Sequence, residues 1–468
     1  AQMQLCLFVD GEPAPGLFDG IDLSVWEGHF AGRDDSQVGL SFSQAGAHGW
    51  VRLVGGLLHL VSRGAGQFWM VSEQRLLEAG GSRELTCLSD GLPENPTGPH
   101  PLPPPASGKS GGKASAPSLY VCTVAMETDY QLNQVFGGDL QAETAYVTSL
   151  LAWASYRFEE QIATVLTFPY VQFYTTSNDP WTAQDNGGGC GDVLTELQSK
   201  WAGNVPAGAE LGHMLSGANL GCGVAWLPGL CNPPYNFSVS GNINGGVSFP
   251  LQVAPGNWDI FVLTHELGHN FGAPHTHDYC PPLDQCANNC TGTTACTNQG
   301  TIMSYCHGCP GGTWNITTYF HPVSAADMRK RVETTCLPLY APDPVPYCFS
   351  KINSQNCAAA VGWEGHPTLS GLDDFAVTAE GVINNQQGLL FYGSGPASIP
   401  FKGGTLCVAS PIERTVVQAA GGNPPPGADC TGSYRYEWDH ADLDQLGAGA
   451  TVYCQYWYRD SADPTGSG

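Results

Sequence analysis

Apolar and polar residues alternate in several short runs within the first ninety residues. The runs cover residues 37–43, 49–54 and 57–61, and Gly55-Gly56 separates the last two. A period of two places alternate side chains on opposite faces of a strand, and paired glycines are typical of a hairpin turn. The pattern predicts that residues 1–90 form a β-rich segment.

A stretch rich in proline, glycine, serine and lysine follows over residues 91–117. It includes residues 103–105, which are all proline, and residues 108–113, which read Gly-Lys-Ser-Gly-Gly-Lys. Such a composition buries too little apolar surface to order the chain. We therefore predict a flexible linker, which is also where we expect a proteinase to cut.

Residues 118–340 read as strands and helices in alternation. Apolar runs at 119–125 and 167–174 predict buried strands. Apolar positions with helical spacing predict helices over 139–161 and 192–201, and a helix capped by Ser324 is predicted to reach residue 332. This order predicts an α/β (or α+β) fold in which helices cover a twisted mixed sheet.

A further helix, beginning near Asn257, carries most of the candidate chemistry. Residues 265–275 read H-E-x-x-H-x-x-G-x-x-H. His265 and His269 are four residues apart, so they lie one turn above the other on the same helix face. Gly272 can end the helix in a left-handed conformation, after which the chain can turn and bring His275 to the same point.

Three neutral imidazoles are the ligands of a catalytic zinc site, because they leave a fourth position open for water. Glu266 adjoins the first histidine and lies within reach of that water. Zinc lowers the pKa of the water and a carboxylate takes its proton, which is the chemistry of carbonyl hydrolysis. The alternatives are a helix with surface histidines and a zinc-binding protein without activity, and Glu266 argues against the second.

The eleven-residue motif, together with residues 300–305, resembles the metzincin zinc endopeptidases, and with the many cysteines it is most similar to their adamalysin (reprolysin) branch. The resemblance implies one catalytic Zn²⁺, protein or peptide substrates, and a metzincin fold for residues 118–340. It also implies that Met303 belongs to a tight turn beneath the metal, although Met303 alone would read as a core residue. A structural Ca²⁺ is common in such relatives, but this sequence offers no matching set of ligands.

The sequence departs from that branch in two places. Thr276 stands where the branch has an aspartate directly after the third histidine, and Asp278 comes two residues later. Tyr305 lies two residues after Met303, a spacing at which a tyrosine of the related astacin and serralysin branches can reach the zinc and stabilise an oxyanion. Tyr305 is therefore either a catalytic aid or an ordinary packed tyrosine.

The resemblance also implies a strand that binds substrate. The edge strand that lines the metzincin cleft is similar to Gly223, Val224, Ala225, Trp226 and Leu227. An open edge has unpaired backbone groups, so an extended peptide can add to it as an extra strand. An ordinary interior strand is the alternative.

Residues 1–90 are similar to the prodomains of adamalysins, with a generic β-domain as the alternative. The family often keeps its zymogens latent with a cysteine thiolate on the zinc, and Cys87 is the candidate here. A disulfide between Cys87 and Cys6 agrees equally well with the sequence.

Eighteen cysteines among 468 residues indicate an oxidising compartment and several disulfides. Six of them lie between residues 279 and 310, where disulfides are favoured over a metal cluster, and the resemblance implies a bridge from Cys336 to Cys231. Residues 118–340 hold eleven cysteines and residues 341–468 hold five. Because both counts are odd, either one bridge joins the two regions or thiols such as Cys122 stay free.

The composition narrows the class of protein further. The net charge of −25 disfavours nucleic acid and anionic membranes as partners, and no run of eighteen apolar residues predicts a membrane span. We expect a secreted protein whose chain starts after signal cleavage. In residues 341–468, alternation and many aromatic residues predict a small β-sandwich as an accessory domain.

Two hypotheses for function follow. The first is a secreted zinc endopeptidase, made as a latent zymogen, with His265, His269 and His275 on the zinc and Glu266 as general base. The second is an extracellular binding or adhesion protein on an inactive metzincin scaffold. The oligomeric state does not follow from the sequence.

Overall fold

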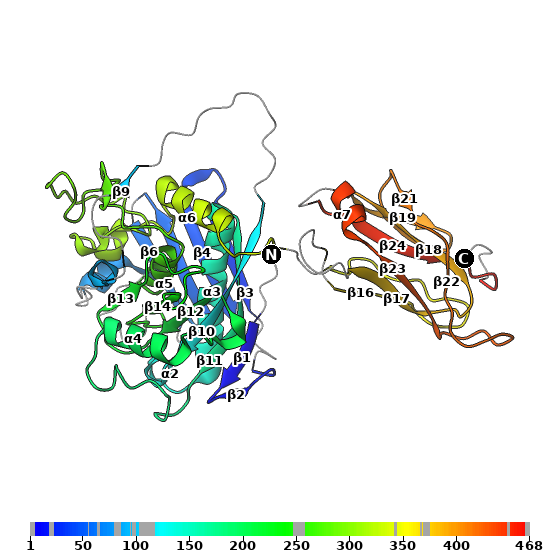
Figure 1. Ribbon diagram of the computed structural model, residues 1–468, viewed down its shortest axis with the longest axis horizontal. Helices are drawn as coiled ribbons and strands as arrows, with labels where there is room; N and C mark the ends of the chain where they lie inside the picture. The colour runs from blue at the N-terminus through cyan, green and yellow to red at the C-terminus, as the bar shows by residue number, and fades with distance from the viewer. Residues whose placement is uncertain are drawn as a thin grey trace, which may run out of the picture. The chain divides into compact units, whose positions relative to one another are not determined.

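The computed structural model divides the chain into two compact units (Figure 1). The first contains residues 1–113 and 119–338, and the second contains residues 339–468 together with the short stretch 114–118. The structure describes residues 5–17, 23–54, 56–62, 66–78, 86–93, 95, 100–102, 118–246, 258–340, 344–365, 367, 375–446 and 450–463. Most of the predicted linker, Gly55 of the predicted hairpin and the predicted helix start at Asn257 lie outside these residues.

A mixed eight-stranded sheet forms the centre of the first unit. Its strand order is β2-β1-β11-β10-β12-β14-β13-β8. Neighbouring strands from β1 to β14 are parallel, whereas β13 runs antiparallel to β14 and β8 runs parallel to β13. The strands are β1 (Leu5–Val9), β2 (Glu12–Pro13), β8 (Thr86–Cys87), β10 (Tyr120–Thr128), β11 (Thr164–Phe173), β12 (Leu211–Leu215), β13 (Cys222–Ala225) and β14 (Phe237–Ser240).

Helices cover both faces of this sheet, and alternate residues of β10 show how. Val124 and Met126 pack in one cluster with α3 and α5, while Ala125 packs in a second cluster with α4. This alternation is the period of two expected of a buried strand. The helices of the first unit are α1 (Glu73–Glu78), which packs against the N-terminal strands, α2 (Tyr130–Val135), α3 (Leu140–Ile162), α4 (Cys190–Trp201), α5 (Trp258–Asn270) and α6 (Pro322–Thr334). The predicted α/β class with a twisted mixed sheet is confirmed.

The sequence predicted the start of α3 correctly and the start of α6 incorrectly. The predicted start at residue 139 is right: Asp139 caps α3, because its carboxylate accepts hydrogen bonds from the N–H groups of Gln141 and Ala142. The predicted cap of α6 at Ser324 is wrong. The helix begins three residues earlier, with His321 as the cap and Pro322 in the first turn, where the missing N–H costs nothing.

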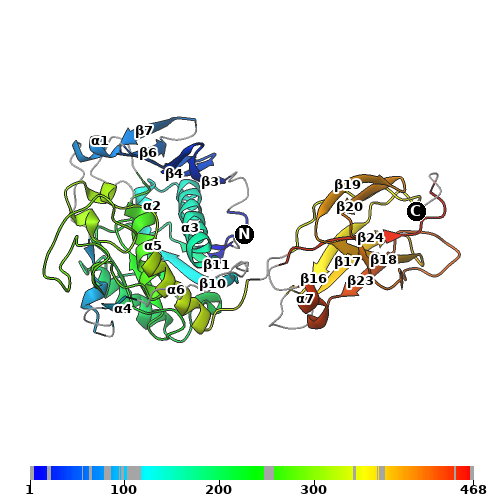
Figure 2. The same cartoon turned by 90° about the horizontal axis from the view of Figure 1, so that it is seen from above.

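A second, five-stranded antiparallel sheet is built from residues 24–72. It comprises β3 (Ser24–Phe30), β4 (Arg33–Ser43), β5 (Gly46–Leu53), β6 (Gly56–Ser62) and β7 (Phe68–Ser72) in that order. The sheet lies against α3 (Figure 2), where the ring of Trp50 meets that of Trp153 edge-on at 4.8 Å. Arg52 donates hydrogen bonds to the carbonyls of Trp314 (3.1 Å) and Ile316 (2.7 Å). The predicted β-rich N-terminal segment is confirmed, and it is packed onto the rest of the unit.

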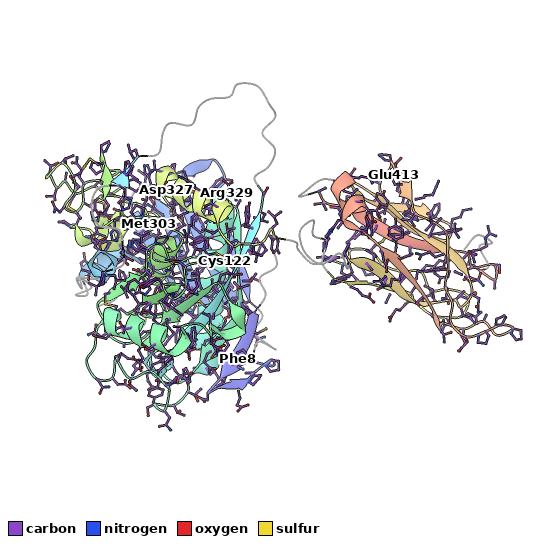
Figure 3. All side chains as sticks on the ribbon, viewed as in Figure 1. Phe8, Cys122, Met303, Asp327, Arg329 and Glu413 are labelled. Atoms are coloured by element: carbon purple, nitrogen blue, oxygen red, sulfur yellow. A yellow bond between two sulfur atoms is a disulfide. The ribbon has the colours of Figure 1, made fainter. Side chains whose placement is uncertain are left out.

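Disulfides join the loops of the first unit. Cys231 bridges Cys336 as the resemblance implied, and the cysteine-dense stretch is bridged internally. The other pairs are Cys190–Cys222, Cys280–Cys290, Cys286–Cys306 and Cys296–Cys309. Cys6 and Cys87 are both unbridged, so the disulfide considered for them is not formed. Cys122 is a buried free thiol in the interior of the unit (Figure 3).

The second unit is β-rich, as predicted. One sheet has the order β16-β17-β23, a second centres on β18 with β21, β22 and β24, and β19 and β20 form a hairpin. Phe375, Val377, Leu390 and Trp438 form an apolar cluster inside it. The elements are β16 (Ala360–Glu364), β17 (Ala376–Val382), β18 (Gln387–Gly393), β19 (Pro396–Phe401), β20 (Gly404–Val408), β21 (Glu413–Arg414), β22 (Gln418–Ala419), β23 (Gly432–Glu437), α7 (His440–Leu446) and β24 (Tyr453–Tyr458).

The second unit contains two disulfide bridges, and the first unit contains a short two-stranded sheet. Cys348–Cys407 and Cys357–Cys430 lie in the second unit, which leaves Cys454 as a free thiol. In the first unit, β9 (His100–Pro101) pairs with β15 (Tyr279–Cys280). Among the described helices, none has both the length and the apolar character needed to cross a bilayer.

Candidate metal centre

Helix α5 and the turn after it bring the three motif histidines together. His265 and His269 project from the same face of α5, and the helix ends at Asn270. Gly272 follows with φ +95°, in the left-handed region, and its N–H donates to the carbonyl of His269 at 2.8 Å. The chain then reverses, and His275 reaches the two helical histidines, as the sequence predicts.

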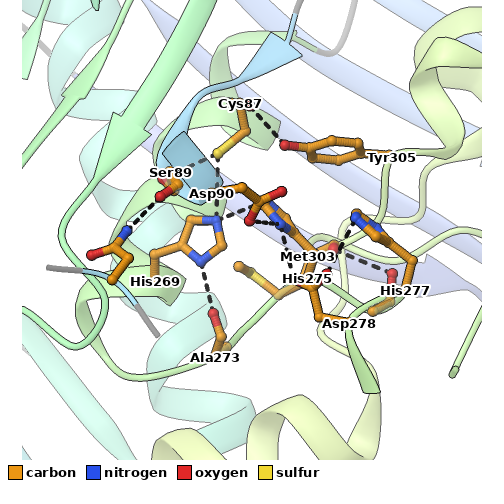
Figure 4. A network of polar contacts seen from close by, with 12 residues as sticks. Cys87, Ser89, Asp90, His269, Ala273, His275, His277, Asp278, Met303 and Tyr305 are labelled. Carbon is orange, nitrogen blue, oxygen red and sulfur yellow. Dashed lines mark hydrogen bonds and ion pairs between the residues drawn. The ribbon is translucent and has the colours of Figure 1, made fainter. Parts of the chain in front are cut away.

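One side-chain atom each from Cys87, His265, His269 and His275 lies within 4.8 Å of the others, and all four residues are buried. Figure 4 shows Cys87, His269 and His275 of this group. The Nε2 atoms of His269 and His275 are 3.0 Å apart, and the Cys87 sulfur is 3.4 Å from Nε2 of His269. Nitrogen and sulfur at such spacing are the donor set that zinc prefers.

In the two helical histidines the outer nitrogen, Nδ1, is the ring nitrogen that contacts a backbone carbonyl instead of the other histidines. Nδ1 of His265 lies 2.5 Å from the carbonyl oxygen of Ile302, and Nδ1 of His269 lies 2.7 Å from that of Ala273. A carbonyl can only accept, so each Nδ1 carries the proton and each Nε2 keeps a lone pair for the centre. Burial lowers the pKa of both histidines well below the usual value, which keeps them neutral. Nε2 of His265 is buried without a hydrogen-bond partner, which fits a metal ligand.

His275 has carboxylates instead of carbonyls at its outer nitrogen. Its Nδ1 lies 2.8 Å from Oδ1 of Asp90 and 3.3 Å from Oδ2 of Asp278, which are ion-pair contacts without the alignment of a hydrogen bond. Burial acts to lower the pKa of His275, but the contacts with Cys87, Asp278 and Asp90 outweigh it and raise the pKa. Of the three histidines, His275 therefore has the most negative charge close to its ring.

Glu266 is buried beside these rings. Its Oε2 accepts a hydrogen bond from the hydroxyl of Ser89 at 3.3 Å and lies 3.6 Å from the Cys87 sulfur. Burial raises the pKa of Glu266 to about 8, and the hydrogen bonds from Cys87 and Ser89 act in the opposite direction. A carboxyl group in such a place can take up and release a proton near neutral pH.

Met303 lies directly under the helix, fully buried (Figures 3 and 4). A Cβ atom on Gly268 would come within 2.6 Å of the Met303 sulfur, so the glycine lets the helix rest on the methionine. The Met303 carbonyl accepts a hydrogen bond from the N–H of Thr276 at 2.9 Å, which ties this turn to the residue after His275.

Comparison with known proteins is consistent with this geometry. Residues 118–320 match the family model Reprolysin_5, metallo-peptidase family M12. These residues form an M12 metallopeptidase domain. The predicted resemblance of these residues to the adamalysin (reprolysin) metallopeptidases is confirmed. We refer to residues 118–320 as the M12 domain.

Two individual proteins are similar over parts of the chain. The disintegrin and metalloproteinase domain-containing protein B of Aspergillus fumigatus is 33% identical over 100 residues, which are 21% of this chain and 10% of that protein. The chain thus matches about a tenth of the length of this curated relative. The crystal structure of metalloproteinase-II from Bacteroides fragilis is 12% identical, with a TM-score of 0.34 over 70% of this chain and 84% of that one.

Tyr305 of the M12 domain faces the same centre. Its hydroxyl donates a hydrogen bond of 2.7 Å to the backbone carbonyl of Cys87, and its ring centroid lies 4.4 Å from that of His275 (Figure 4). Burial, together with the negative groups nearby, raises the pKa of Tyr305, so the hydroxyl stays protonated and acts as a donor.

Strand β13 contains Gly223, Val224 and Ala225 of the predicted substrate strand, and Trp226 and Leu227 continue it. Within the M12 domain β13 is an edge strand, and β8 of the N-terminal segment pairs with it. The N–H of Leu88 donates to the carbonyl of Gly223 at 2.9 Å. The segment therefore occupies the edge that the sequence assigned to a peptide substrate.

Two side chains of the segment extend this contact, and sequence reasoning missed both. The Ser89 hydroxyl accepts from the N–H of Ala225 at 2.9 Å. Asn95 accepts from the N–H of Leu227 at 2.7 Å and donates to the carbonyl of Ala225 at 3.1 Å. Nothing in the local sequence marks these residues, and only their closeness to Cys87 along the chain could have drawn attention to them.

Gly223 offers a test of how closely Glu266 is held. A Cβ atom at this position would lie 2.3 Å from Oε1 of Glu266 and 2.7 Å from Cγ2 of Val262. We predict that Gly223→Ala displaces the carboxylate and lowers peptide cleavage by the activated protein about 100-fold, because misplacement by about 1 Å has that effect. Zinc content, measured by atomic emission, should not change.

The matched control is Gly191→Ala, where an added Cβ would meet no atom within 4 Å. Equal cleavage by the two variants would show that Gly223 does not fix the carboxylate.

Proposed function

We propose that the chain is a secreted, zinc-dependent endopeptidase that is made as a latent zymogen. The observation that carries the proposal is the buried cluster of three imidazoles in the M12 domain with the carboxyl of Glu266 beside it. The alternative of a binding protein on an inactive scaffold has no support at this site, because the glutamate is in place.

His265, His269 and His275 would hold the zinc through their Nε2 atoms. When bound, zinc supplies Lewis acidity for the peptide carbonyl and lowers the pKa of water. Glu266 takes the proton of the attacking water and passes it to the departing amine. The carbonyls of Ile302 and Ala273 hold the two helical imidazoles in orientation while this occurs.

The β13 edge would bind the substrate backbone. The groups that the N-terminal segment now engages are the carbonyls of Gly223 and Ala225 and the N–H groups of Ala225 and Leu227. An extended peptide offers complementary donors and acceptors at the same spacing, whatever its side chains. This supports protein or peptide substrates.

Latency would rest on residues 1–90. Cys87 places its sulfur among the imidazoles, and β8 covers the substrate edge. Burial and the neighbouring Glu266 raise the pKa of the Cys87 thiol to about 11, so in the protein alone the sulfur is protonated. A bound zinc ion would deprotonate a coordinating thiol. The thiolate would then take the position that water needs.

Secretion is supported by the disulfides. Seven bridges across the described residues favour an oxidising compartment, and the net charge of −25 disfavours nucleic acid as a partner. The second unit, beyond residue 338, would then be an extracellular accessory module.

Glu266→Ala tests the chemistry. We predict one zinc per chain in both the natural protein and the variant, because the three imidazoles are unchanged. Peptide cleavage after activation should fall about 10²–10⁴-fold, the usual contribution of a general base.

Glu333→Ala on α6, where the side chain is half exposed, is the matched control and should keep full activity. A natural protein without zinc, or an active Glu266→Ala variant, would contradict the assignment.

Cys87→Ser tests latency in the uncut chain. A hydroxyl is a poorer zinc ligand than a thiolate, so we predict that the full-length variant cleaves peptides while the natural chain of the same length does not. Cys122→Ser, which alters another buried free thiol, should leave the chain latent. If the uncut natural chain is already as active as Cys87→Ser, the segment does not silence it.

Tyr305→Phe tests the hydroxyl. The Tyr305 hydroxyl donates to the Cys87 carbonyl in this structure. Once β8 has left the site, the hydroxyl would be free to donate to the oxyanion of the substrate. We predict a fall in kcat of about 10²-fold with little change in KM, as for loss of one oxyanion donor. Tyr279→Phe, whose hydroxyl bonds to Asp327 instead, is the control. An unchanged kcat would make Tyr305 a packing residue.

A further inference from the structure

His275 differs from the other two histidines in what holds its outer nitrogen. The M12 domain provides a backbone carbonyl for His265 and another for His269, at 2.5 and 2.7 Å. For His275 the facing groups are the carboxylates of Asp90 and Asp278. Asp90 belongs to the N-terminal segment, and Asp278 belongs to the M12 domain.

Asp90 is the nearer carboxylate but is not a permanent one. It lies 2.8 Å from Nδ1 in the short turn Ser89–Gly91, directly after Cys87, and its side chain is 53% exposed. Whatever removes Cys87 from the centre removes Asp90 with it. The active form of the proposed enzyme must therefore hold His275 by another group.

Asp278 is in place to take over. It follows His275 by three residues, and its own N–H donates to the His275 carbonyl at 3.1 Å, so the two residues close one turn. Its Oδ2 is 3.3 Å from Nδ1 of His275, and its Oδ1 is 3.5 Å from Nε2 of His277. The ring of His277 stacks on that of His275 with an angle of 6° between the planes, which limits rotation of both rings.

We propose that Asp278 is the positioning residue for His275 in the active form. Its carboxylate accepts the proton of Nδ1, fixes the tautomer and leaves the Nε2 lone pair for zinc. Such a carboxylate also makes the imidazole a stronger ligand than a carbonyl partner does. This inference rests on the proposed function, since it assigns the orientation of one ligand of the same site.

The departure of this sequence from the adamalysin pattern then has a structural reason. Thr276 stands where an aspartate is usual, and its hydroxyl contacts Asp284 and lies 3.2 Å from the carbonyl of Met303. The Thr276 side chain therefore links the loop after His275 to the turn that contains Met303. The carboxylate that serves His275 comes two residues later, on the far side of the turn.

The experiment compares single and double variants of the uncut chain. The zinc dissociation constant of each is measured by competition with a chromophoric chelator. Asp90→Asn alone should leave zinc affinity unchanged, because Asp278 still faces Nδ1. The pair Asp90→Asn with Asp278→Asn should weaken zinc binding about 10–100-fold, the usual effect of losing an outer partner of a ligating histidine. Asp278→Glu in place of Asp278→Asn should restore most of the affinity, which a merely structural role would not predict.

The matched control combines Asp90→Asn with Asp185→Asn, since Asp185 bonds to Gln131 and contacts no histidine of the centre. Circular dichroism checks that each variant is folded. A tenfold loss with Asp90→Asn alone, or no loss in the Asp90/Asp278 pair, would overturn the inference. If the natural chain binds no zinc, the proposed function itself fails. If it binds zinc and the pair binds equally well, the inference about Asp278 alone fails.

Discussion

Three imidazole rings share the buried centre of the M12 domain, and each needs an acceptor for one of its two nitrogens. A buried ring without such an acceptor would be free to turn or to take the wrong tautomer. The domain supplies backbone carbonyls for two rings, from the turn before Met303 and from the reversal after α5, and for the third it places the carboxylate of Asp278 3.3 Å from Nδ1. Much of the loop structure around α5 can be understood as the scaffold for these three contacts.

A second constraint comes from the ends of the central sheet. The edge strands of a sheet carry unpaired backbone groups, and strands from outside the M12 domain pair with both of that domain's edge strands. β1 and β2 lie beyond β11 at one end, and β8 lies beyond β13 at the other. The N-terminal segment is therefore a structural part of the first unit, and β8 covers the edge to which we propose that a peptide substrate binds.

The sequence allowed the helical histidines, Glu266, Gly272 and Met303 to be located, because spacing within one helix and one turn is a local property. The α/β order and the bridge between Cys231 and Cys336 were also foreseen, the second through resemblance to a family. The start of α6 was misplaced, since Ser324 and Pro322 are both residue types that favour a helix start, and histidine, the actual cap, is not a preferred cap residue. Ser89, Asp90 and Asn95 were missed because their roles depend on partners more than a hundred residues away.

For the proposed zymogen, the position of β1 has a consequence for activation. A cut in the linker separates residues 1–90 from the M12 domain covalently, but β1 would stay paired with β11, and Arg52 would stay bonded to the loop at Trp314. The two pieces would remain a non-covalent complex, with β8 still paired to β13. Enzyme activity would then rise at the pace of dissociation, faster on dilution, and the severed fragment would act as a tight inhibitor of its own parent at high concentration.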